Sequence, residues 1–396
     1  MTFRAEIPYG CYWSTPFAKW QGAFANLHAV EFAAQVTRAE LARRQIAADV
    51  LDHGVLGFSV PQKHSFYGLP WLAGMAGLGH LAGPTVMQAC ATGVRAMLAG
   101  AQEIQQGLAH ASLAVTCDRT SNGPHLYYPN PRGPGGTGAH EDWVMDNFSC
   151  DPLGPHAMIR TAENVASKHG ISTAEQHDVV LMREAQYREA LGDFQARFFA
   201  EVPIKADEGV RNSTREKLAQ LKPVVDGGTV TYGAQTFPAD GNAGIVLAGP
   251  EIAKQLSTNP QIRVRLLGFG QSRAKLAHMP EAAVAAAGRA LDQAGLKMRD
   301  MKAVKTHSPF AVNDVFFSRS TGVPLSKMNN FGCSLVWGHP QGPTGMRSVI
   351  ELIEELAAAG GGHGLFAGCA AGDTAMAVVL SVGNSLALPF TGGGSA

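Results

Sequence analysis

The sequence predicts an α/β protein made of two similar halves. In the first half, a helical pattern over residues 27–47 leads into an apolar, glycine-punctuated strand over residues 51–60. The same order returns in the second half, where an alanine-rich helical pattern over residues 282–296 precedes a short strand over residues 301–306. Alternating helices and strands in both halves favour duplicated α/β domains whose sheets are covered by helices.

Each half also carries a strand–turn–helix unit with a cysteine at or near its turn. The first, VMQACATGVRAMLAGAQEI, predicts a strand over residues 85–87, Cys90 at the turn and a helix over residues 91–108. The second, FGCSLVWGHPQGPTGMRSVIELIEEL, predicts a helix over residues 346–358. Similar segments of this kind also occur in α/β proteins without an internal repeat, but two matching units favour duplication.

We expect an N-terminal domain over residues 1–250 and a C-terminal domain over residues 251–396. The first contains an insertion, over about residues 118–224, that starts with a stretch rich in Pro, Gly, Asn and His. Helical patterns follow over residues 159–168, 173–191 and 215–221. Because long insertions in compact proteins usually serve as lids or binding loops, we expect this one to cover the active site.

The composition excludes several functional classes. Lys plus Arg and Asp plus Glu each total 32, so the formal net charge is zero and no basic surface for nucleic acid is indicated. No stretch reaches the about 18 apolar residues of a membrane-spanning helix, and the N-terminus does not resemble a secretory signal. The six cysteines show neither a CxxC pair nor zinc-ligand spacing, so we expect a reducing, cytoplasmic compartment and no bound metal.

The low charge content points to extensive internal surface. Charged residues make up 16% of the chain, against about 25% in average soluble proteins. Hydrophobic residues make up 45%. We therefore expect a subunit interface, as in a homodimer or a dimer of dimers.

Cys90 lies where a cysteine can become a nucleophile. A thiol at the N-terminus of a helix faces the positive end of the helix dipole and unpaired backbone N–H groups, which favour the thiolate and lower the thiol pKa. Gly93, three residues further on, leaves room for a ligand to approach the turn. Taken alone, a cysteine flanked by small residues is more often part of a core. Other residues of the chain are therefore needed to choose between a nucleophile and a core cysteine.

Two glycine-rich segments supply partners for Cys90. The segment GHPQGPTG holds His339 in a turn where glycines let a substrate approach, which suits a proton-handling or oxyanion-binding imidazole. The segment GCAAG places Cys369 in a small-residue turn between strands over residues 364–367 and 375–380. With two thiols and an imidazole, one thiolate can attack an acyl carbon while the other thiol moves a proton at a carbon acid.

Six ordered motifs resemble the thiolase family, over essentially the whole chain. They are STPFAKWQGAFANLHA, QACATG, TAENVASKHGISTAEQHD, EVPIKADEGVR with LKPVVDGGTVTYGAQTFPADGNAG, NNFGCSLVWGHPQGPTGMR, and GLFAGCAAGD. The resemblance implies a duplicated thiolase fold with αβαβα layers. It also implies an acyltransferase that cleaves a 3-oxoacyl-CoA or forms one by Claisen condensation, with coenzyme A as substrate and no cofactor bound in this chain.

The resemblance further implies catalytic roles. Cys90 would carry the acyl group as a thioester, and His339 would help to activate it and would bind the enolate oxygen. Cys369 would be the acid and base. The backbone N–H groups of Cys90 and Ala371 would bind the oxyanions of the tetrahedral intermediates.

Four positions would bind the substrate by the same resemblance. Thr236 falls where the family has a serine that contacts pantetheine, and Arg211 falls where it has an arginine near the nucleotide. Met158 aligns with a methionine of the acyl pocket, and Phe310 belongs to a motif at the site. Ordinary surface or packing positions are the alternative interpretation.

The chain departs from the family pattern at the place of the NEAF motif. There it reads His307-Ser308-Pro309-Phe310, followed by Asn313-Asp314. This HxxFxxN pattern is similar to the HDCF-type motif of sterol-carrier-like thiolases, and it implies that His307 is a catalytic oxyanion donor. A structural histidine packed under the site is the alternative.

Two further departures bear on the substrate more than on the catalysis. In the CxGGG turn, Ala371 replaces a glycine and Asp373 adds charge, and Ala234 and Gln235 stand where Asn and Ala are usual.

Aromatic residues could form a pocket for a bulky, aromatic or branched acyl chain, or they could simply pack in the core and at a dimer interface. They are Tyr12, Trp13, Phe17, Trp20, His64, Phe66, Tyr67, Trp71, Tyr127 and Tyr128.

Two other functions compete with a thiolase. One is a thiolase-like C–C acyltransferase subunit that works with a small OB-fold partner, which would bring the zinc that this chain has no motif to bind. The other is a non-catalytic scaffold of the same fold. Retention of Cys90, His339 and Cys369 argues against the scaffold.

Overall fold

One mixed sheet of eleven strands runs through residues 3–384, which the computed structural model describes. Its main path has the order β11-β12-β13-β10-β1-β9-β6-β4-β5, and β2 and β3 also pair with β9. The strands are β1 (Glu6–Pro8), β2 (Tyr12–Ser14), β3 (Ala18–Lys19), β4 (His53–Gly57), β5 (Thr85–Val86), β6 (Ala111–Arg119), β9 (Ala239–Ala248), β10 (Ile262–Arg273), β11 (Met301–Thr306), β12 (Gly362–Ala370) and β13 (Thr374–Asn384).

The strand pairing repeats in the two halves of the sheet. In the N-terminal half, β4 lies parallel to β6, β6 antiparallel to β9, and β9 antiparallel to β1. In the C-terminal half, β11 lies parallel to β12, β12 antiparallel to β13, and β13 antiparallel to β10. The strands β1 and β10 join the halves, with Glu6 opposite Arg265. The same order and directions in both halves confirm the predicted duplicated α/β fold.

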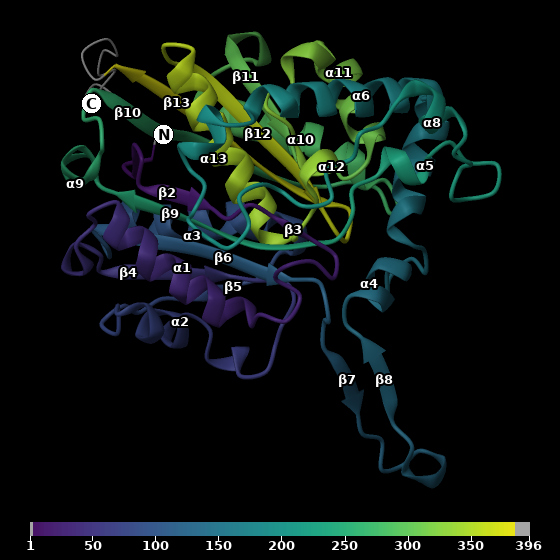
Figure 1. Cartoon of the computed structure of the whole chain (residues 1–396), viewed down its shortest axis with the longest axis horizontal. Helices are drawn as coiled ribbons and strands as arrows, with labels where there is room; N and C mark the ends of the chain where they lie inside the picture. The colour runs from purple at the N-terminus through teal and green to yellow at the C-terminus, as the bar shows by residue number, and fades with distance from the viewer. Residues whose placement is uncertain (1–2, 385–396) are drawn as a thin grey trace, which may run out of the picture.

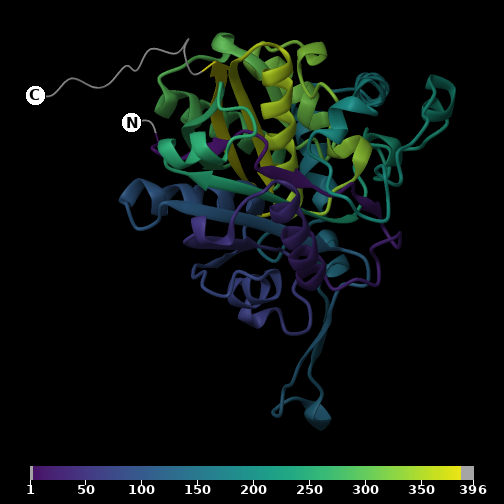
Figure 2. The same cartoon turned by 60° about the vertical axis from the view of Figure 1, so that its left-hand side comes forward.

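Helices form three layers around the two half-sheets (Figures 1 and 2). The helices α1 (Ala29–Arg43) and α2 (Leu69–Ala76) cover the outer face of the N-terminal half, and α10 (Met279–Ala294) covers that of the C-terminal half. Between the halves lie α3 (Thr92–Gln106) and α13 (Gly342–Ala358), which share a buried apolar cluster with both. This order of layers is the predicted αβαβα arrangement.

The helix α13 is buried along most of its length, from Gly342 to Glu355. Charged side chains near its middle form ion pairs, because an unpaired buried charge is strongly destabilising. The Nη1 atom of Arg347 lies 2.6 Å from Asp207 Oδ1, and its Nε lies 3.0 Å from Glu351 Oε1. This packing gives the segment just before α13, which carries His339, a fixed support.

The two central helices approach closely at a glycine. A Cβ atom on Gly93 would lie 2.6 Å from the carbonyl oxygen of Gly342 and 2.7 Å from the backbone nitrogen of Met346. The expectation that Gly93 leaves room for a ligand is therefore wrong. Glycine at this position lets α3 pack against α13.

The insertion after β6 consists of a hairpin and several helices. The hairpin of β7 (His125–Tyr128) and β8 (Ala139–Asp142) projects from the layered body (Figures 1 and 2). The helices α5 (Met158–His169) and α6 (Thr173–Ala190) instead pack against α11 (Ala311–Thr321) of the C-terminal half. The shorter helices of the chain are α4 (Met145–Ser149), α7 (Asp193–Ala196), α8 (Arg215–Ala219), α9 (Pro250–Leu256) and α12 (Ser334–Trp337).

Most of the predicted helices and strands are present, but the predicted position of Cys369 in a turn is wrong. The strand expected over residues 301–306 is β11, with the same bounds. Cys369, however, lies within β12 opposite Ala375, not in the following turn, because the ladder between β12 and β13 continues to Ala370.

Within residues 3–384, no helix is both long enough and apolar enough to cross a membrane. All six cysteines fall in this range, and each is a free thiol.

Candidate active site

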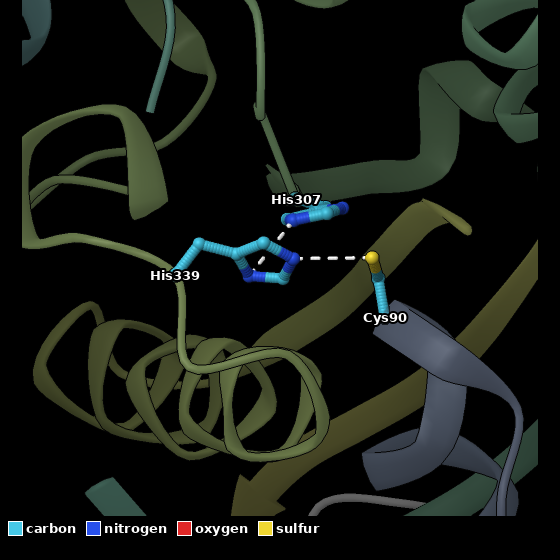
Figure 3. Close-up of side chains that lie close together, drawn as sticks. All are labelled: Cys90, His307 and His339. Carbon is cyan, nitrogen blue, oxygen red and sulfur yellow. Dashed lines mark hydrogen bonds between the residues drawn. The ribbon is translucent and has the colours of Figure 1, made fainter. Parts of the chain in front are cut away.

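Four candidate residues from four different segments meet beside the N-terminal ends of the two central helices. Cys90 lies in the 3₁₀ turn Ala89–Ala91, directly before α3. His339 lies between α12 and α13, His307 follows β11, and Cys369 lies near the end of β12. Figure 3 shows the His307 ring above the His339 ring and the Cys90 sulfur to its right, each joined to His339 by a dashed line. The structure thus brings together all four residues that the sequence singled out for catalysis.

Hydrogen-bond distances link these residues in a chain. The Nε2 atom of His339 lies 3.1 Å from Cys90 Sγ (Figure 3). Its Nδ1 atom lies 3.1 Å from His307 Nε2 and 2.6 Å from Thr344 Oγ1. The Nδ1 atom of His307 lies 3.1 Å from the carbonyl oxygen of Cys369 and 3.8 Å from its sulfur.

These hydrogen bonds determine which nitrogen atom of each imidazole carries the hydrogen. A carbonyl oxygen only accepts hydrogen bonds, so the Nδ1 atom of His307 must carry the hydrogen and donate it to Cys369. In neutral His307 the Nε2 atom is then an acceptor, and it receives a hydrogen bond from Nδ1–H of His339. The Nε2 atom of His339 is left with its lone pair directed at the thiol of Cys90.

Burial keeps both imidazoles neutral. His307 and His339 are 2% and 6% exposed. Loss of hydration lowers the pKa of His307 to about 4, although the Cys369 carbonyl opposes this effect. Burial and the neighbouring His307 lower the pKa of His339 well below its ordinary value. At neutral pH, His339 is therefore an uncharged base beside the Cys90 thiol.

The thiol of Cys90 is not a free thiolate in the resting protein. Burial raises its pKa to about 12, which outweighs the lowering by the backbone N–H groups of Ala371 and of Cys90 itself. The prediction that the helix start alone lowers this pKa is therefore wrong, because desolvation is the larger effect. Thiolate formation depends on transfer of the proton to His339.

Cys369 has a different environment. Asn313 Nδ2 donates a hydrogen bond to its sulfur at 3.2 Å. Burial, followed by the neighbouring Cys90 and, to a lesser degree, Asp373, raises the Cys369 pKa, and the Asn313 hydrogen bond only partly offsets this. The charge that we expected Asp373 to add is held by two backbone hydrogen bonds, from Ala277 at 2.8 Å and His278 at 2.9 Å. Cys369 is thus protonated at neutral pH and available as an acid.

Backbone strain gathers at the same place. Four non-glycine residues have positive φ close to the four candidates, a conformation that costs about 1–3 kcal/mol and often marks functional sites. They are Ala89 (φ 42°), Ser308 (φ 57°), Gln341 (φ 62°) and Asp373 (φ 58°).

The four candidate substrate-binding residues lie around this centre. Phe310 and Met158 belong to the same apolar cluster as Cys369. Thr236 lies beside them, since its backbone nitrogen donates to the carbonyl oxygen of Pro309 at 2.7 Å. Its hydroxyl donates to a carbonyl oxygen, that of Ser334, at 2.6 Å.

Arg211 lies on the loop before α8, and its side chain contacts the segment that carries Thr236. Its guanidinium group is stacked on Tyr232 at 4.8 Å and on Phe237 at 5.4 Å. One of its N–H groups donates to the carbonyl oxygen of Tyr232 at 3.1 Å. A half-buried cation on two aromatic rings that flank Thr236 in the sequence is a suitable contact for an anionic group.

Within residues 3–384, two groups of side chains have ligand atoms close enough together to hold a metal ion. The first is Cys90, His307 and His339 themselves, whose ligand atoms lie within 4.8 Å of one another. The hydrogen bonds already described pair these atoms, which favours proton transfer over metal binding. In the second group, Asp151, His156 and Asp373, both carboxylates accept backbone hydrogen bonds.

Comparison with known proteins identifies the family. Residues 13–251 match the thiolase N-terminal domain, and residues 261–382 match the thiolase C-terminal domain. This chain belongs to the thiolase family.

Individual thiolases resemble the chain over nearly its whole length. It is 28% identical over 384 residues to an acetyl-CoA acetyltransferase of Escherichia coli (strain K12), covering 92% of this chain and 96% of that protein. It is 27% identical over 388 residues to the mitochondrial 3-ketoacyl-CoA thiolase of Homo sapiens, with the same coverage. The crystal structure of human mitochondrial 3-ketoacyl-CoA thiolase in complex with CoA matches with a TM-score of 0.88 at 26% identity, covering 96% of this chain and 99% of that one. The predicted thiolase fold and acyltransferase class are confirmed.

Two expectations about the surroundings of this thiolase site are not met. The β7–β8 hairpin projects away from the layered body, so this part of the insertion does not cover the site (Figure 1). The aromatic residues do not line one common pocket either. Tyr12, Trp13 and Phe17 are fully buried in three separate core clusters, whereas Phe66 and Tyr67 are 95% and 70% exposed.

Three residues that touch the thiolase site were not among the predicted site residues. Asn313 contacts Cys369, and Gln341 contacts Cys90, with its Oε1 3.1 Å from the sulfur. The buried carboxylate of Asp118 accepts the backbone N–H of Gly342 at 2.9 Å, at the start of α13. Asn313 and Gln341 did stand inside the HxxFxxN and GHPxGxTG motifs, at positions whose side chains no local pattern assigns.

The neutral, buried histidines predict an acid-sensitive fold. Unfolded His307 binds a proton below about pH 6.5, whereas the folded residue does so only below about pH 4. The unfolded state therefore gains protons first, and the free energy of unfolding falls between these pH values, on the order of 3 kcal/mol for this residue. His339 acts in the same direction. We expect His307→Asn to lose less stability than the unmodified protein when urea unfolding is compared at pH 7 and pH 4.5.

Buried carboxyls with a raised pKa oppose this effect, so the comparison needs a control. Burial raises the pKa of Asp118 to about 7, and acidification therefore stabilises the fold through this group. Asp118 is unchanged in the variant, so its contribution cancels. His64→Asn, at an exposed position with φ 69° that asparagine tolerates, should keep the unmodified pH dependence. Equal losses in all three proteins contradict the prediction.

Proposed function

We propose that this protein is a CoA-dependent thiolase that transfers an acyl group through a thioester on Cys90, cleaving a 3-oxoacyl-CoA or forming one by Claisen condensation. The observation that carries the proposal is the hydrogen-bond chain Cys369–His307–His339–Cys90, which leaves a neutral base 3.1 Å from the nucleophile. The activities in the names of the human and Escherichia coli relatives support the same reaction.

In the first half-reaction, the S–H bond of Cys90 breaks, its proton passes to His339 Nε2, and the thiolate attacks C3 of the 3-oxoacyl-CoA. The backbone N–H groups of Cys90 and Ala371, which face the sulfur at rest, would then bind the oxyanion. The C2–C3 bond breaks, and its electron pair forms the enolate of acetyl-CoA. His339 Nε2–H would bind the enolate oxygen while the Cys369 thiol gives its proton to C2.

In the second half-reaction, the Cys369 thiolate takes a proton from the thiol of free CoA. The CoA sulfur attacks the thioester, the bond to Cys90 breaks, and the shortened acyl-CoA leaves. The Cys90 thiolate regains its proton from His339, which restores both groups. Condensation is the reverse sequence, with the same residues in the same places.

The substrate would lie along the loop formed by residues 232–237. Arg211 and Thr236 would contact the nucleotide and pantetheine portions, and Met158 and Phe310 the acyl end beside Cys369. The CoA complex of the human relative supports CoA as a substrate of this fold. The placement of the aromatic residues gives no support for a bulky acyl chain.

His307, in the motif similar to that of sterol-carrier-like thiolases, would have a catalytic role of its own. Since its Nε2 accepts from His339, His307 would orient the catalytic imidazole at rest. It would donate to the enolate oxygen only after His339, protonated at Nε2 by the thiol, has passed its Nδ1 proton to His307 Nε2. Losing one preorganised donor typically costs about 100- to 1000-fold in rate. We expect a loss of this size in kcat for His307→Ala.

A second variant separates chemistry from packing. Substituting His307→Asn restores the residue common at this place in the family and keeps a hydrogen-bonding group, so it should retain much of the turnover. Melting temperatures of both variants serve as the reference for folding. A near-normal kcat in His307→Ala, together with a lowered melting temperature, would return this residue to a purely structural role.

The proposed reaction is tested with the purified chain alone and a panel of 3-oxoacyl-CoA substrates with short, branched and aromatic chains. CoA-dependent loss of the enolate absorbance is the expected result, and the pattern over the panel defines the acyl chain. Activity without any partner excludes an obligatory OB-fold subunit and a scaffold role. Inactivity over the whole panel overturns the proposal in favour of those two alternatives. Solution mass measurements test the expected homodimer or dimer of dimers.

A further inference from the structure

We propose that Gln341 is a catalytic residue of this site, which presents a carboxamide N–H to the Cys90 sulfur and stabilises its thiolate. The inference deepens the proposed function, on which it rests for the role of Cys90 as the acyl-carrying thiol. Gln341 is 6% exposed, and its Oε1 lies 3.1 Å from Cys90 Sγ. It is therefore in direct contact with a reacting atom.

The backbone conformation of Gln341 indicates that its position is enforced. Its φ of 62° and ψ of −102° place it in a region that residues with a Cβ rarely adopt. A glycine would adopt this conformation without strain, yet the chain has a glutamine here. The strain is retained together with a side chain that reaches the nucleophile, two residues after the base His339.

The decisive observation is that one hydrogen faces two acceptors. In the tautomer fixed by the Cys369 carbonyl, His339 Nε2 has a lone pair and lies 3.1 Å from Cys90 Sγ. The carboxamide oxygen of Gln341 lies at the same distance from the same sulfur. The thiol has a single hydrogen, so if it points to His339, an oxygen lone pair of Gln341 faces a sulfur lone pair.

A half turn of the carboxamide about its last torsion removes this conflict. The turn exchanges the oxygen for the amino group and leaves the rest of the side chain in place. The thiol hydrogen then goes to His339, and a Gln341 N–H points to the sulfur. When the proton has moved to His339, the electron pair stays on sulfur, and the thiolate accepts hydrogen bonds from Gln341, from Ala371 and from His339.

Other groups around the sulfur do not supply this contact. Asp118 raises the Cys90 pKa through its charge, and Cys369 lies close enough to interact electrostatically with it. The ring of His307 is turned to His339 and to the Cys369 backbone. In the described structure, the side chains of His339 and Gln341 lie within hydrogen-bonding distance of the Cys90 sulfur. Of these two, Gln341 has the carboxamide that can donate an N–H.

The test measures the reactivity of the Cys90 thiol directly, without CoA or a 3-oxoacyl substrate. Iodoacetamide reacts with thiolates, so its rate at Cys90, followed over pH by peptide mass, reports the thiol pKa. Gln341→Glu keeps the shape but replaces the N–H donor with a carboxylate. We expect its alkylation rate at pH 8 to fall by about tenfold or more, with the pH profile shifted upward by about one unit.

Gln341→Gly serves as the second variant, because glycine suits the backbone conformation at this position. It removes the donor without adding charge, so its rate should fall less than that of Gln341→Glu but clearly below the unmodified protein. The matched control is Gln88→Leu, two residues before Cys90, whose carboxamide bonds Arg95 at 2.7 Å and not the sulfur. It should leave the Cys90 profile unchanged.

The outcomes separate this inference from the proposed function. An unshifted profile in either folded variant, or a faster reaction in Gln341→Glu, overturns the role of Gln341. An effect as large in Gln88→Leu also overturns it, because the shift would then be a general disturbance of the turn. Inactivity of the unmodified protein towards 3-oxoacyl-CoA substrates would overturn the proposed function alone, since alkylation needs no substrate.

Discussion

Replacing Cys90 by serine removes the covalent acyl adduct and lowers kcat by at least about 10⁴-fold, the scale seen when a nucleophile is removed from a catalytic group that acts as a unit. The hydroxyl has nearly the shape of the thiol but ionises far less readily. Neutral His339, 3.1 Å away, is too weak a base to compensate. Intact-mass spectrometry after mixing with an acyl-CoA measures the adduct, and peptide mapping places it on Cys90.

A cysteine outside the site provides the control. Cys11 is fully buried, and its thiol donates to the carbonyl oxygen of Leu256 at 3.1 Å, a bond that a serine hydroxyl can also make. Cys11→Ser should therefore keep both the adduct and the turnover. An adduct of unchanged amount in Cys90→Ser would remove Cys90 from the role of nucleophile.

Replacing Cys369 by alanine separates the two halves of the chemistry. The variant should still form some acyl adduct on Cys90, because the base His339 and the backbone N–H of Ala371 remain. It should lose turnover by about 10²- to 10⁴-fold, the usual contribution of a positioned acid or base. The raised pKa of Cys369 keeps its proton in place for transfer to C2 of the leaving enolate.

Single-turnover and steady-state measurements together decide this point. Acylation is followed by intact mass after rapid mixing, and turnover by loss of the enolate absorbance. Cys333→Ala, at another buried thiol of the same apolar cluster, controls for packing. If Cys369→Ala keeps turnover within about tenfold of the unmodified protein, worth about 1.4 kcal/mol of barrier, Cys369 is not the acid.

Local pattern was sufficient for most elements and for the choice of Cys90 and His339 as candidates, and the family resemblance added the role of His307. The strand over residues 301–306 and the helix beginning at Thr173 follow from short-range periodicity, which needs no knowledge of distant contacts. Cys90 and His339 stood out because glycines and helix starts next to a thiol or an imidazole are visible within ten residues of sequence.

Close packing between distant segments could not be predicted in this way. Gly93 has the same local sequence whether it faces a ligand or another helix. In the structure it faces Gly342, about 250 positions away in the chain. Likewise the length of β12, which decides that Cys369 is on a strand, depends on its partner β13.

The sequence by itself determined the repeat of helix and strand in two halves, the family and the four candidate catalytic residues. Only the tertiary structure decided their protonation. The Cys90 thiol has a raised pKa because folding removes water from it, and His339 is a base because the Cys369 carbonyl sets the tautomer of His307. Hydration and hydrogen-bond direction depend on which atoms meet in space, and that information exists only once the chain has folded.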